Sequence, residues 1–356
     1  MDKKTVIIGM SGGVDSSVAA YILKEQGYNV IGVTMQTWQD CCTNGTGETC
    51  GGNSAIEDAG CAARQLEIPH YVIDFQKEFR QKVINYFIDE YKKGCTPNPC
   101  IACNKYIKWE ALLKYARENG ADYIATGHYA RIIKLANGRY TVGRSAAGRK
   151  DQTYVLYGLG QHQLGHTLMP AGDYSKEEIR AIAKKAGLNV ADKSESQDIC
   201  FIPDGNYAGF IERETGSKCT IGNFIDEDGN VLGVHKGIEH YTIGQRKGLN
   251  LPAKQPYYVK KIIPETNEVV LGDADSIFTD TVFADAINYM AVKNLDVPRR
   301  LMAKIRYAHA GAWCEVIPLP GGRIECHFDE KQRAVTPGQA IVFYENDYVF
   351  GGGRIS

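Results

Sequence analysis

Residues 11–17 read Ser-Gly-Gly-Val-Asp-Ser-Ser and stand between an apolar run, 5–10, and a stretch of helical character, 18–26. Two glycines let a backbone turn tightly and bring its N–H groups close to an anion. The following helix would point its unpaired N–H groups and the positive end of its dipole at the same place. The spacing therefore predicts a phosphate or pyrophosphate site. The loop lacks the Lys of a Walker A motif and the third Gly of a dinucleotide fingerprint, so neither motif applies.

A second reactive group is the C-x-x-C pair Cys100 and Cys103 in the segment TPNPCIACN. The two prolines stiffen an extended chain, and Cys103 is expected at the start of a helix that carries Lys105 and Lys108. A helix N-terminus and nearby cations favour the thiolate, which is the nucleophilic form. Three interpretations stay open: half of a zinc site, a dithiol redox pair, or two ligands of an iron–sulfur cluster completed by a third cysteine.

The candidate for that third cysteine is Cys200, in the segment SQDICFI, where an α/β pattern gives way to a β-rich one. Junctions between domains commonly hold active sites, although a buried structural cysteine beside Phe and Ile is the alternative. Eleven cysteines is an odd and high number, and in a reducing compartment it favours thiol or metal chemistry over a disulfide framework. Cys41, Cys42 and Cys50 gather in one Gly/Thr-rich segment and have no assigned role.

Composition limits the class of protein. A chain of 356 residues with 44% hydrophobic and 23% charged residues is expected to form two or three ordinary globular domains. No apolar stretch is long enough to span a bilayer, and the N-terminus runs straight into a predicted strand, so a cytoplasmic protein without a membrane partner is expected. The net charge of −1 means that a face for nucleic acid would have to be local. Candidate basic clusters are 92–93, 105–108, 144–150, 246–247 and 299–306.

Strands and helices alternate as far as residue 204. Strands are predicted at 5–10, 29–35, 70–74 and 123–126, helices at 16–26, 54–66, 79–93, 104–118, 152–157 and 176–186, and a hairpin at 131–142. This alternation predicts a doubly wound parallel sheet, whose binding site lies at the carboxyl ends of the strands. The 11–17 loop, Met35 and Gly127-His128 all follow strands, so they are expected on one rim.

Beyond residue 204 the helical pattern fades and short strands recur. The predicted domains are 1–204 for the α/β part, 205–275 for a small β-rich central domain, and 276–356 for an antiparallel β-barrel. Barrel strands are expected at 303–307, 314–318, 323–328, 340–344 and 348–352.

Seven sequence blocks carry a family resemblance. SGGVDSS matches the loop of the PP-loop ATP-pyrophosphatases. It is followed in order by TPNPC-x-x-CN, ATGHYAR (125–131), KDQTYVL (150–156), SQDICFI (196–202), YTIGQRKGL (241–249) and PGQAIVFY (337–344). In this order the blocks make the chain similar to bacterial tRNA-specific 2-thiouridylases over essentially its whole length. The resemblance implies an adenine nucleotide alpha hydrolase-like fold for the first domain.

The resemblance also implies residue roles. ATP binding falls on Gly9, Met10, Ser11, Gly12, Gly13, Val14, Asp15, Ser16, Met35 and Gly127. Cys103 matches the nucleophile, and Cys200 matches the cysteine that carries the persulfide sulfur. Contacts to the target base or to tRNA fall on Asn98, Pro99, Cys100, His128, Lys150, Asp151, Gln152, Arg306, Tyr307 and Gln339.

The reaction implied by the resemblance replaces the C2 oxygen of wobble uridine 34, in tRNAs for Lys, Glu and Gln, with sulfur. ATP with Mg²⁺ adenylates the oxygen, and a cysteine desulfurase or a sulfur-relay protein supplies the persulfide. The products are 2-thiouridine, AMP and pyrophosphate.

Many relatives carry Asp where this chain has Cys100. That difference raises an alternative in which Cys100, Cys103 and Cys200 ligate a [4Fe–4S] cluster whose fourth iron carries sulfide. Two other classes of protein account for fewer of these sequence features. A PP-loop synthetase for a small molecule leaves the cysteines and the barrel unexplained, and a non-catalytic tRNA- or zinc-binding module leaves the phosphate loop without a purpose.

Overall fold

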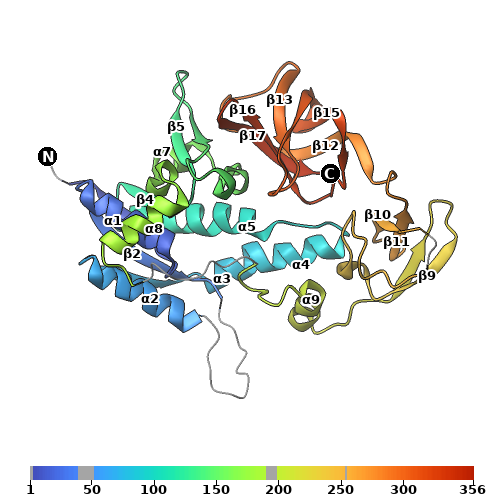
Figure 1. Ribbon diagram of the computed structural model, residues 1–356, viewed down its shortest axis with the longest axis horizontal. Helices are drawn as coiled ribbons and strands as arrows, with labels where there is room; N and C mark the ends of the chain where they lie inside the picture. The colour runs from blue at the N-terminus through green and yellow to red at the C-terminus, as the bar shows by residue number, and fades with distance from the viewer. Residues whose placement is uncertain (1–2, 39–51, 190–198, 253–254) are drawn as a thin grey trace.

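The computed structural model describes residues 3–38, 52–189, 199–252 and 255–356, which form three parts (Figure 1). The first part contains a five-stranded parallel sheet in the order β3-β2-β1-β4-β7. Its strands are β1 (Thr5–Gly9), β2 (Asn29–Gln36), β3 (His70–Asp74), β4 (Tyr123–Ala125) and β7 (Thr167–Leu168). The order reverses direction at β1, so the crevice beyond the carboxyl ends of β1 and β4 is the expected ligand site.

Helices cover both faces of this sheet, which confirms the predicted doubly wound fold. Val6 and Ile8 of β1 pack with α1 (Val14–Glu25), α2 (Gly52–Gln65) and α8 (Lys176–Lys185) on one face. Ile7 points to the opposite face, because successive side chains of a strand alternate. There it joins a core with Trp109 and Leu112.

Two long helices contain π-helical segments. One runs through α3 (Gln76–Phe79), η1 (Arg80–Ile84) and α4 (Asn85–Lys92), and the other through α5 (Pro99–Ala102), η2 (Cys103–Ala111) and α6 (Leu112–Glu118). Both reach from the sheet toward the other two parts (Figure 1).

The second long helix begins five residues earlier than predicted. Asn98 caps it by accepting a hydrogen bond from the Cys100 amide at 3.1 Å, and Pro99 occupies its first position. Cys103 therefore lies about one turn inside the helix, and the prediction that it begins the helix is wrong.

Shorter elements fill the rest of the first part. They are the hairpin β5 (Arg131–Lys134) and β6 (Tyr140–Gly143), α7 (Gln161–Gly165), and the 3-10 turns η3 (Gly148–Lys150), η4 (Thr153–Leu156) and η5 (Pro170–Asp173). The predicted hairpin is confirmed, whereas the predicted helix at 152–157 is the 3-10 turn η4. The predicted cap of α8 is also confirmed, because Ser175 and Glu178 exchange side-chain and backbone hydrogen bonds.

The second part combines one helix with a four-stranded sheet. It contains α9 (Tyr207–Thr215), η6 (Ile238–His240), and the strands β8 (Gly222–Ile225), β9 (Val231–His235), β10 (Tyr258–Ile263) and β11 (Glu268–Gly272) in the order β10-β11-β8-β9. Phe224, Val259, Val269 and Leu271 lie in its core.

The third part is a closed six-stranded antiparallel barrel. Its strands are β12 (Phe278–Tyr289), β13 (Arg299–Lys304), β14 (Ala312–Leu319), β15 (Arg323–Arg333), β16 (Ala340–Glu345) and β17 (Tyr348–Ile355), with η7 (Pro320–Gly322) between β14 and β15. The barrel closes because β12 pairs with both β15 and β17.

The barrel corrects one predicted strand and contains another that was not predicted. The strand expected at 303–307 lies at Arg299–Lys304, so Arg306 and Tyr307 fall in the turn after it. β12 escaped prediction because its inward positions include small residues such as Ala284, which give a weak apolar alternation.

The first and third parts share one core. Trp109, Leu112 and Leu156 pack in the same cluster as Val342 and Val349 of the barrel. The hairpin strand β6 also pairs with β17. The domain limits 1–204, 205–275 and 276–356 therefore stay a prediction. Across the described ranges, no helix has the length and apolar character needed to cross a membrane.

Candidate active site

The phosphate loop lies at the carboxyl end of β1. Gly12 adopts a positive φ of 71°, and a Cβ there would lie 2.4 Å from the backbone oxygen of Ala55. Only glycine fits this position, because both the backbone conformation and the close approach exclude a side chain. Gly13 is the N-cap of α1 and offers no side-chain cap, so the first N–H groups of the helix are left for another acceptor.

The serine hydroxyls mainly hold the shape of the loop. Ser16 Oγ accepts from the Ser11 amide at 3.2 Å and donates to the Gly13 oxygen at 3.2 Å, and Ser17 Oγ donates to the same oxygen at 3.0 Å. Ser16 and Ser17 are buried, whereas Ser11 is exposed at the mouth of the loop.

The predicted ATP-site residues meet around this loop. A Cβ on Gly127 would lie 2.6 Å from the Ser16 nitrogen and 2.7 Å from the carbonyl carbon of Asp15. A Cβ on Gly9 would lie 3.2 Å from Cε of Met35. The structure thus brings residues 9–16, Met35 and Gly127 to one rim, as expected from the strand ends.

Two residues at this rim were not found by sequence reasoning. The Asp15 carboxylate accepts hydrogen bonds from Tyr129 Oη at 2.6 Å and from Lys176 Nζ at 2.7 Å. The Lys176 side chain is 12% exposed. Tyr129 could have been found from its place in the ATGHYAR block, but nothing in the sequence marks Lys176, which begins a helix far along the chain.

His128 connects the phosphate loop to the second long helix, 99–118, which carries Cys100 and Cys103 and is called the thiol helix below. It follows Gly127 directly, and Lys108 Nζ lies 3.5 Å from its Nε2. Its Nδ1 lies 2.8 Å from Thr126 Oγ1. Burial, with a further contribution from Lys108, holds the pKa of His128 well below its usual range. The ring is therefore neutral, with Nε2 accepting from Lys108 and Nδ1–H donating to Thr126.

Lys108 also faces the thiols. It lies five residues after Cys103 within the π-helical segment η2, and a π-helix brings residues i and i+5 to the same side. Its charge acts on Cys100, Cys103 and Cys200, and the first two thiols act on the third. The charge of Lys108 therefore reaches all three predicted thiols.

The pKa of each of the three thiols is raised, whereas the sequence predicts conditions that favour the thiolate. Desolvation raises the pKa of Cys100 and Cys103, and it raises the pKa of Cys200 to about 12, while Lys108 acts in the opposite direction on all three. Cys100 and Cys200 are exposed, yet the surrounding protein still disfavours their charged form. The expectation that a helix N-terminus favours the Cys103 thiolate is wrong, because burial outweighs the single cation.

The described residues give no support to a resident metal or cluster. Across the described ranges, no three His, Cys, Asp or Glu side chains gather into a metal-binding group. Cys100, Cys103 and Cys200 thus do not form a ready ligand set for a [4Fe–4S] cluster, which requires thiolates. The same ranges contain no cluster of carboxylates that could hold Mg²⁺.

The barrel contributes a turn beside the thiols. Tyr307 Oη donates to the Asp151 carbonyl at 3.3 Å, and Tyr307 is 44% exposed. Burial raises the pKa of Tyr307, with smaller effects of Asp151 and Cys100 in the same direction. Lys150 is exposed, and Arg306 lies next to Tyr307 in the same turn. Of these residues, Tyr307 is the one that Cys100 influences electrostatically.

Other predicted tRNA contacts make hydrogen bonds within the protein. The Asp151 carboxylate accepts from the amides of Ser145 and Thr153. Gln152 Oε1 accepts from the Tyr129 amide at 2.9 Å, and Gln339 Nε2 donates to the Thr96 carbonyl at 2.8 Å. Asn98 caps α5 and Pro99 is buried at its first position. In this structure these side chains therefore hold parts of the protein together.

Part of the predicted constellation lies outside the described residues. Cys41, Cys42 and Cys50 fall there, as do residues 196–198 before Cys200.

The strand order and the glycine-rich loop define a PP-loop nucleotide-binding protein. The chain matches the family model described as tRNA methyl transferase HUP domain over residues 4–204. It also matches a tRNA methyl transferase PRC-barrel domain over 208–273 and an aminomethyltransferase beta-barrel domain over 279–355.

Relatives in several bacteria are similar to the whole chain. The tRNA-specific 2-thiouridylase MnmA of Lachnoclostridium phytofermentans is 57% identical over 99% of both chains. The proteins of that name from Clostridium kluyveri and Clostridium perfringens are 54% and 52% identical, over 99% and 100% of this chain and 99% of each relative. The chain belongs to the tRNA-specific 2-thiouridylase family.

Proposed function

We propose that this protein is a tRNA-uridine 2-sulfurtransferase that converts wobble uridine 34 of tRNAs for Lys, Glu and Gln to 2-thiouridine. The observation that carries the proposal is the link between the phosphate loop and the thiols. Gly127 packs against the loop, the next residue, His128, lies 3.5 Å from Lys108, and the charge of Lys108 acts on all three thiols. Activation of an oxygen and its replacement by sulfur would then take place in one site.

The first step is adenylation. The uridine C2 oxygen attacks the α-phosphorus of ATP, and pyrophosphate leaves. The N–H groups at the start of α1 are suited to hold the departing pyrophosphate, and Mg²⁺ bound to the phosphates would offset their charge. A uridine oxygen is a poor leaving group, whereas AMP is a good one, so this step prepares C2 for substitution.

The second step transfers sulfur. The terminal sulfur of a Cys200 persulfide attacks C2, and AMP leaves. The Cys103 thiolate then attacks the inner sulfur, which forms a Cys103–Cys200 disulfide and releases the thiocarbonyl product. An external dithiol reductant must restore both thiols with two electrons. In a variant of this route, Cys103 adds covalently to the activated C2 before sulfur arrives.

Both routes need a sulfur donor and a large substrate. A cysteine desulfurase or a relay protein would load Cys200, which is exposed. Lys150, Arg306 and Tyr307 would contact the tRNA near the extruded base. We place the reaction in the cytoplasm, where cellular reductants keep thiols free.

The names of the family models mention methyl transfer, whereas the full-length relatives are named for thiolation. Two thiols that influence each other, Cys103 and Cys200, favour sulfur transfer, because a persulfide carrier and a resolving thiol are both required for it.

The test is thiolation of tRNA with ATP and a persulfide donor. Cys103→Ser and Cys200→Ser should each abolish 2-thiouridine formation while ATP binding survives. Cys219→Ser, which removes a half-buried thiol of the central part, is the control. Thiolation that persists in either variant would remove that residue from the proposal, and pyrophosphate release with small acceptors in place of tRNA would favour a synthetase.

The cluster alternative is tested by iron content and absorption after anaerobic purification. A colourless, iron-free protein that thiolates tRNA excludes it. Cys100→Asp should remain active if Cys100 is not a ligand.

A further inference from the structure

We propose that Arg354 is a positioning residue that fixes the turn at residues 94–96 against the barrel and thereby sets the place of the thiol helix. Its consequence for thiolation rests on the function proposed above. The placement of the turn does not, and it can be measured separately.

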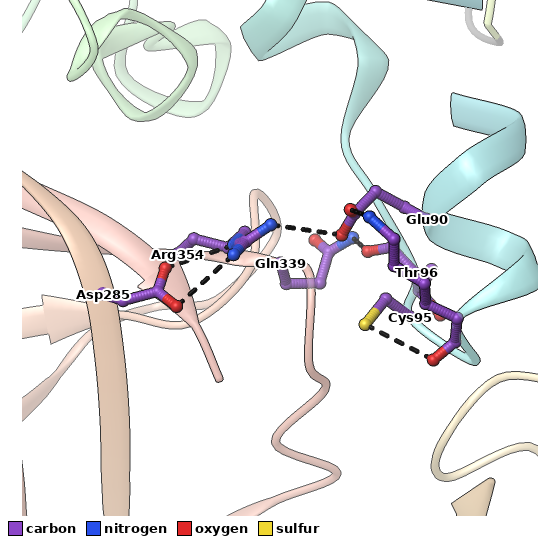
Figure 2. A network of polar contacts seen from close by, with 7 residues as sticks. Glu90, Cys95, Thr96, Asp285, Gln339 and Arg354 are labelled. Atoms are coloured by element: carbon purple, nitrogen blue, oxygen red, sulfur yellow. Dashed lines mark hydrogen bonds and ion pairs between the residues drawn. The ribbon is translucent and has the colours of Figure 1, made fainter. Parts of the chain in front are cut away.

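The ion pairs of Arg354 join the barrel to the first part of the molecule (Figure 2). Arg354 lies in the last strand, β17, and its guanidinium contacts Asp285 of β12 at 3.2 and 3.4 Å. Its third nitrogen lies 3.4 Å from Oε2 of Glu90 in α4. Glu90 is buried, and its other oxygen accepts from Lys93 Nζ at 2.9 Å. Removing Arg354 would leave a buried carboxylate with one partner fewer, which is costly.

The backbone of the turn is bound to the barrel as well. The Thr96 amide donates to the Pro337 carbonyl at 2.9 Å, and the Thr96 carbonyl accepts from Gln339 Nε2 at 2.8 Å. Gly338, with a φ of 89°, approaches the turn so closely that a Cβ added to it would lie 2.9 Å from Cβ of Cys95. Both hydrogen-bonding groups of the Thr96 backbone are therefore used by the barrel.

The second part of the molecule, through Thr242, Ile262 and Pro264, contacts the other side of the same turn. A Cβ on Gly94 would lie 2.9 Å from Cγ2 of Ile262 and 3.0 Å from Cγ of Pro264. Thr96 Oγ1 donates to Thr242 Oγ1 at 3.4 Å. All three parts of the molecule thus meet at residues 94–96.

A short, stiff segment connects this junction to the thiols. Only Pro97 and Asn98 separate Thr96 from the first turn of α5, and prolines at 97 and 99 limit the backbone freedom between them. A shift of the turn would therefore move Cys100 and Cys103, because the connecting residues cannot absorb it. The geometry assigns to the barrel the role of holding the thiol helix in place.

The test is Arg354→Gln in the full chain. We expect faster amide exchange at Thr96 and alkylation of Cys100 and Cys103 by iodoacetamide that is faster by about fivefold or more, while ATP binding stays unchanged. Arg80→Gln is the matched control, because it removes the same charge from a different ion pair. In that pair, Arg80 Nη1 lies 2.6 Å from Oε2 of Glu214. Thr96 exchange and alkylation equal to wild type in folded Arg354→Gln would overturn the proposal.

Two further variants keep the proposal testable if Arg354→Gln does not fold. Arg354→Lys keeps the charge but loses the bidentate contact, and Gln339→Leu removes the amide donor to Thr96. Both are expected to raise Thr96 exchange. Gln339→Leu that weakens tRNA binding with normal exchange and alkylation would instead make Gln339 a tRNA contact and count against the junction. Absence of thiolation by the wild-type protein would contradict the proposed function only, since exchange and alkylation need no tRNA.

Discussion

At the residue scale, two opposing effects set the pKa of Cys100, Cys103 and Cys200: desolvation raises it and the charge of Lys108 lowers it. Burial disfavours the thiolate of Cys103 more strongly than Lys108 favours it. Lys108 is itself held by His128, whose neutral ring accepts its hydrogen bond. A raised pKa lowers the fraction of thiolate, which is the form that oxidants and alkylating reagents attack.

Lys108→Met tests this balance. Because the pKa of Cys103 is raised, its alkylation rate in the wild-type protein should still increase as the pH rises above the ordinary thiol value of about 8.5. Loss of the cation should move the profile to higher pH and slow alkylation at pH 8 by about three- to tenfold. The measurement is the rate of iodoacetamide labelling of Cys103 across pH.

Lys105→Met is the control for this prediction, since Lys105 lies on the same helix but directs its ammonium to the Tyr106 ring at 5.2 Å. A profile that shifts equally in both variants would show that Lys108 has no special influence on the thiols.

At the scale of single elements, the site depends on where strands end and how closely loops approach. The rim is assembled by the ends of β1 and β4, and Gly127 allows the second to touch the start of α1. The π-helical segment η2 sets the side on which Lys108 emerges. These are properties of backbone geometry, so they are sensitive to a single added carbon atom.

Gly127→Ala should disrupt nucleotide use. The new Cβ would press on the backbone of Asp15 and Ser16, which cannot move without opening the loop. We expect a loss of about 1–3 kcal/mol in stability and a clear rise in the KM for ATP, measured by thermal unfolding and by tRNA-dependent pyrophosphate release.

Gly120→Ala separates the close approach from a general cost of losing glycine. Gly120 has a φ of 71° and no atom within 4 Å of its Cβ position, so its replacement should lower stability without changing the KM for ATP. An unchanged KM in Gly127→Ala would refute the packing role of Gly127.

At the scale of the whole molecule, the barrel and the α/β part are built around one shared core. Val342 of the barrel and Trp109 of the α/β part belong to one buried cluster. Arg139 of the hairpin also donates to the carbonyls of Met290 and Tyr289. A substitution in this shared core on the barrel side should therefore also destabilise the parallel sheet.

Val342→Ala should destabilise both parts together. Truncation of a buried valine costs about 1–3 kcal/mol, and here the lost contacts lie between the parts. Hydrogen exchange should rise in β1 and α6 as well as in β16. Val316→Ala makes the same change in the barrel's own core and should raise exchange in the barrel alone. Identical exchange patterns for the two variants would mean that the shared core does not couple the parts.

The parallel sheet, the glycine-rich loop at residues 11–17 and the three candidate thiols could be predicted from the amino-acid sequence. These follow from local signals, namely the alternation of apolar runs, glycine spacing, and cysteines beside prolines. The start of the thiol helix was misplaced because a short-range cap by Asn98 extended it through Pro99. β12 was missed because burial in a closed barrel does not require large apolar residues.

The protonation of these thiols and the partners of the loop residues depend on the folded chain. Desolvation depends on atoms from the whole chain, so the raised pKa of Cys103 could not be read from its neighbours in sequence. Lys176 reaches Asp15 across 161 positions, and Arg354 meets Glu90 across 264. Contacts of this kind leave no local pattern, because they arise where separate elements pack together.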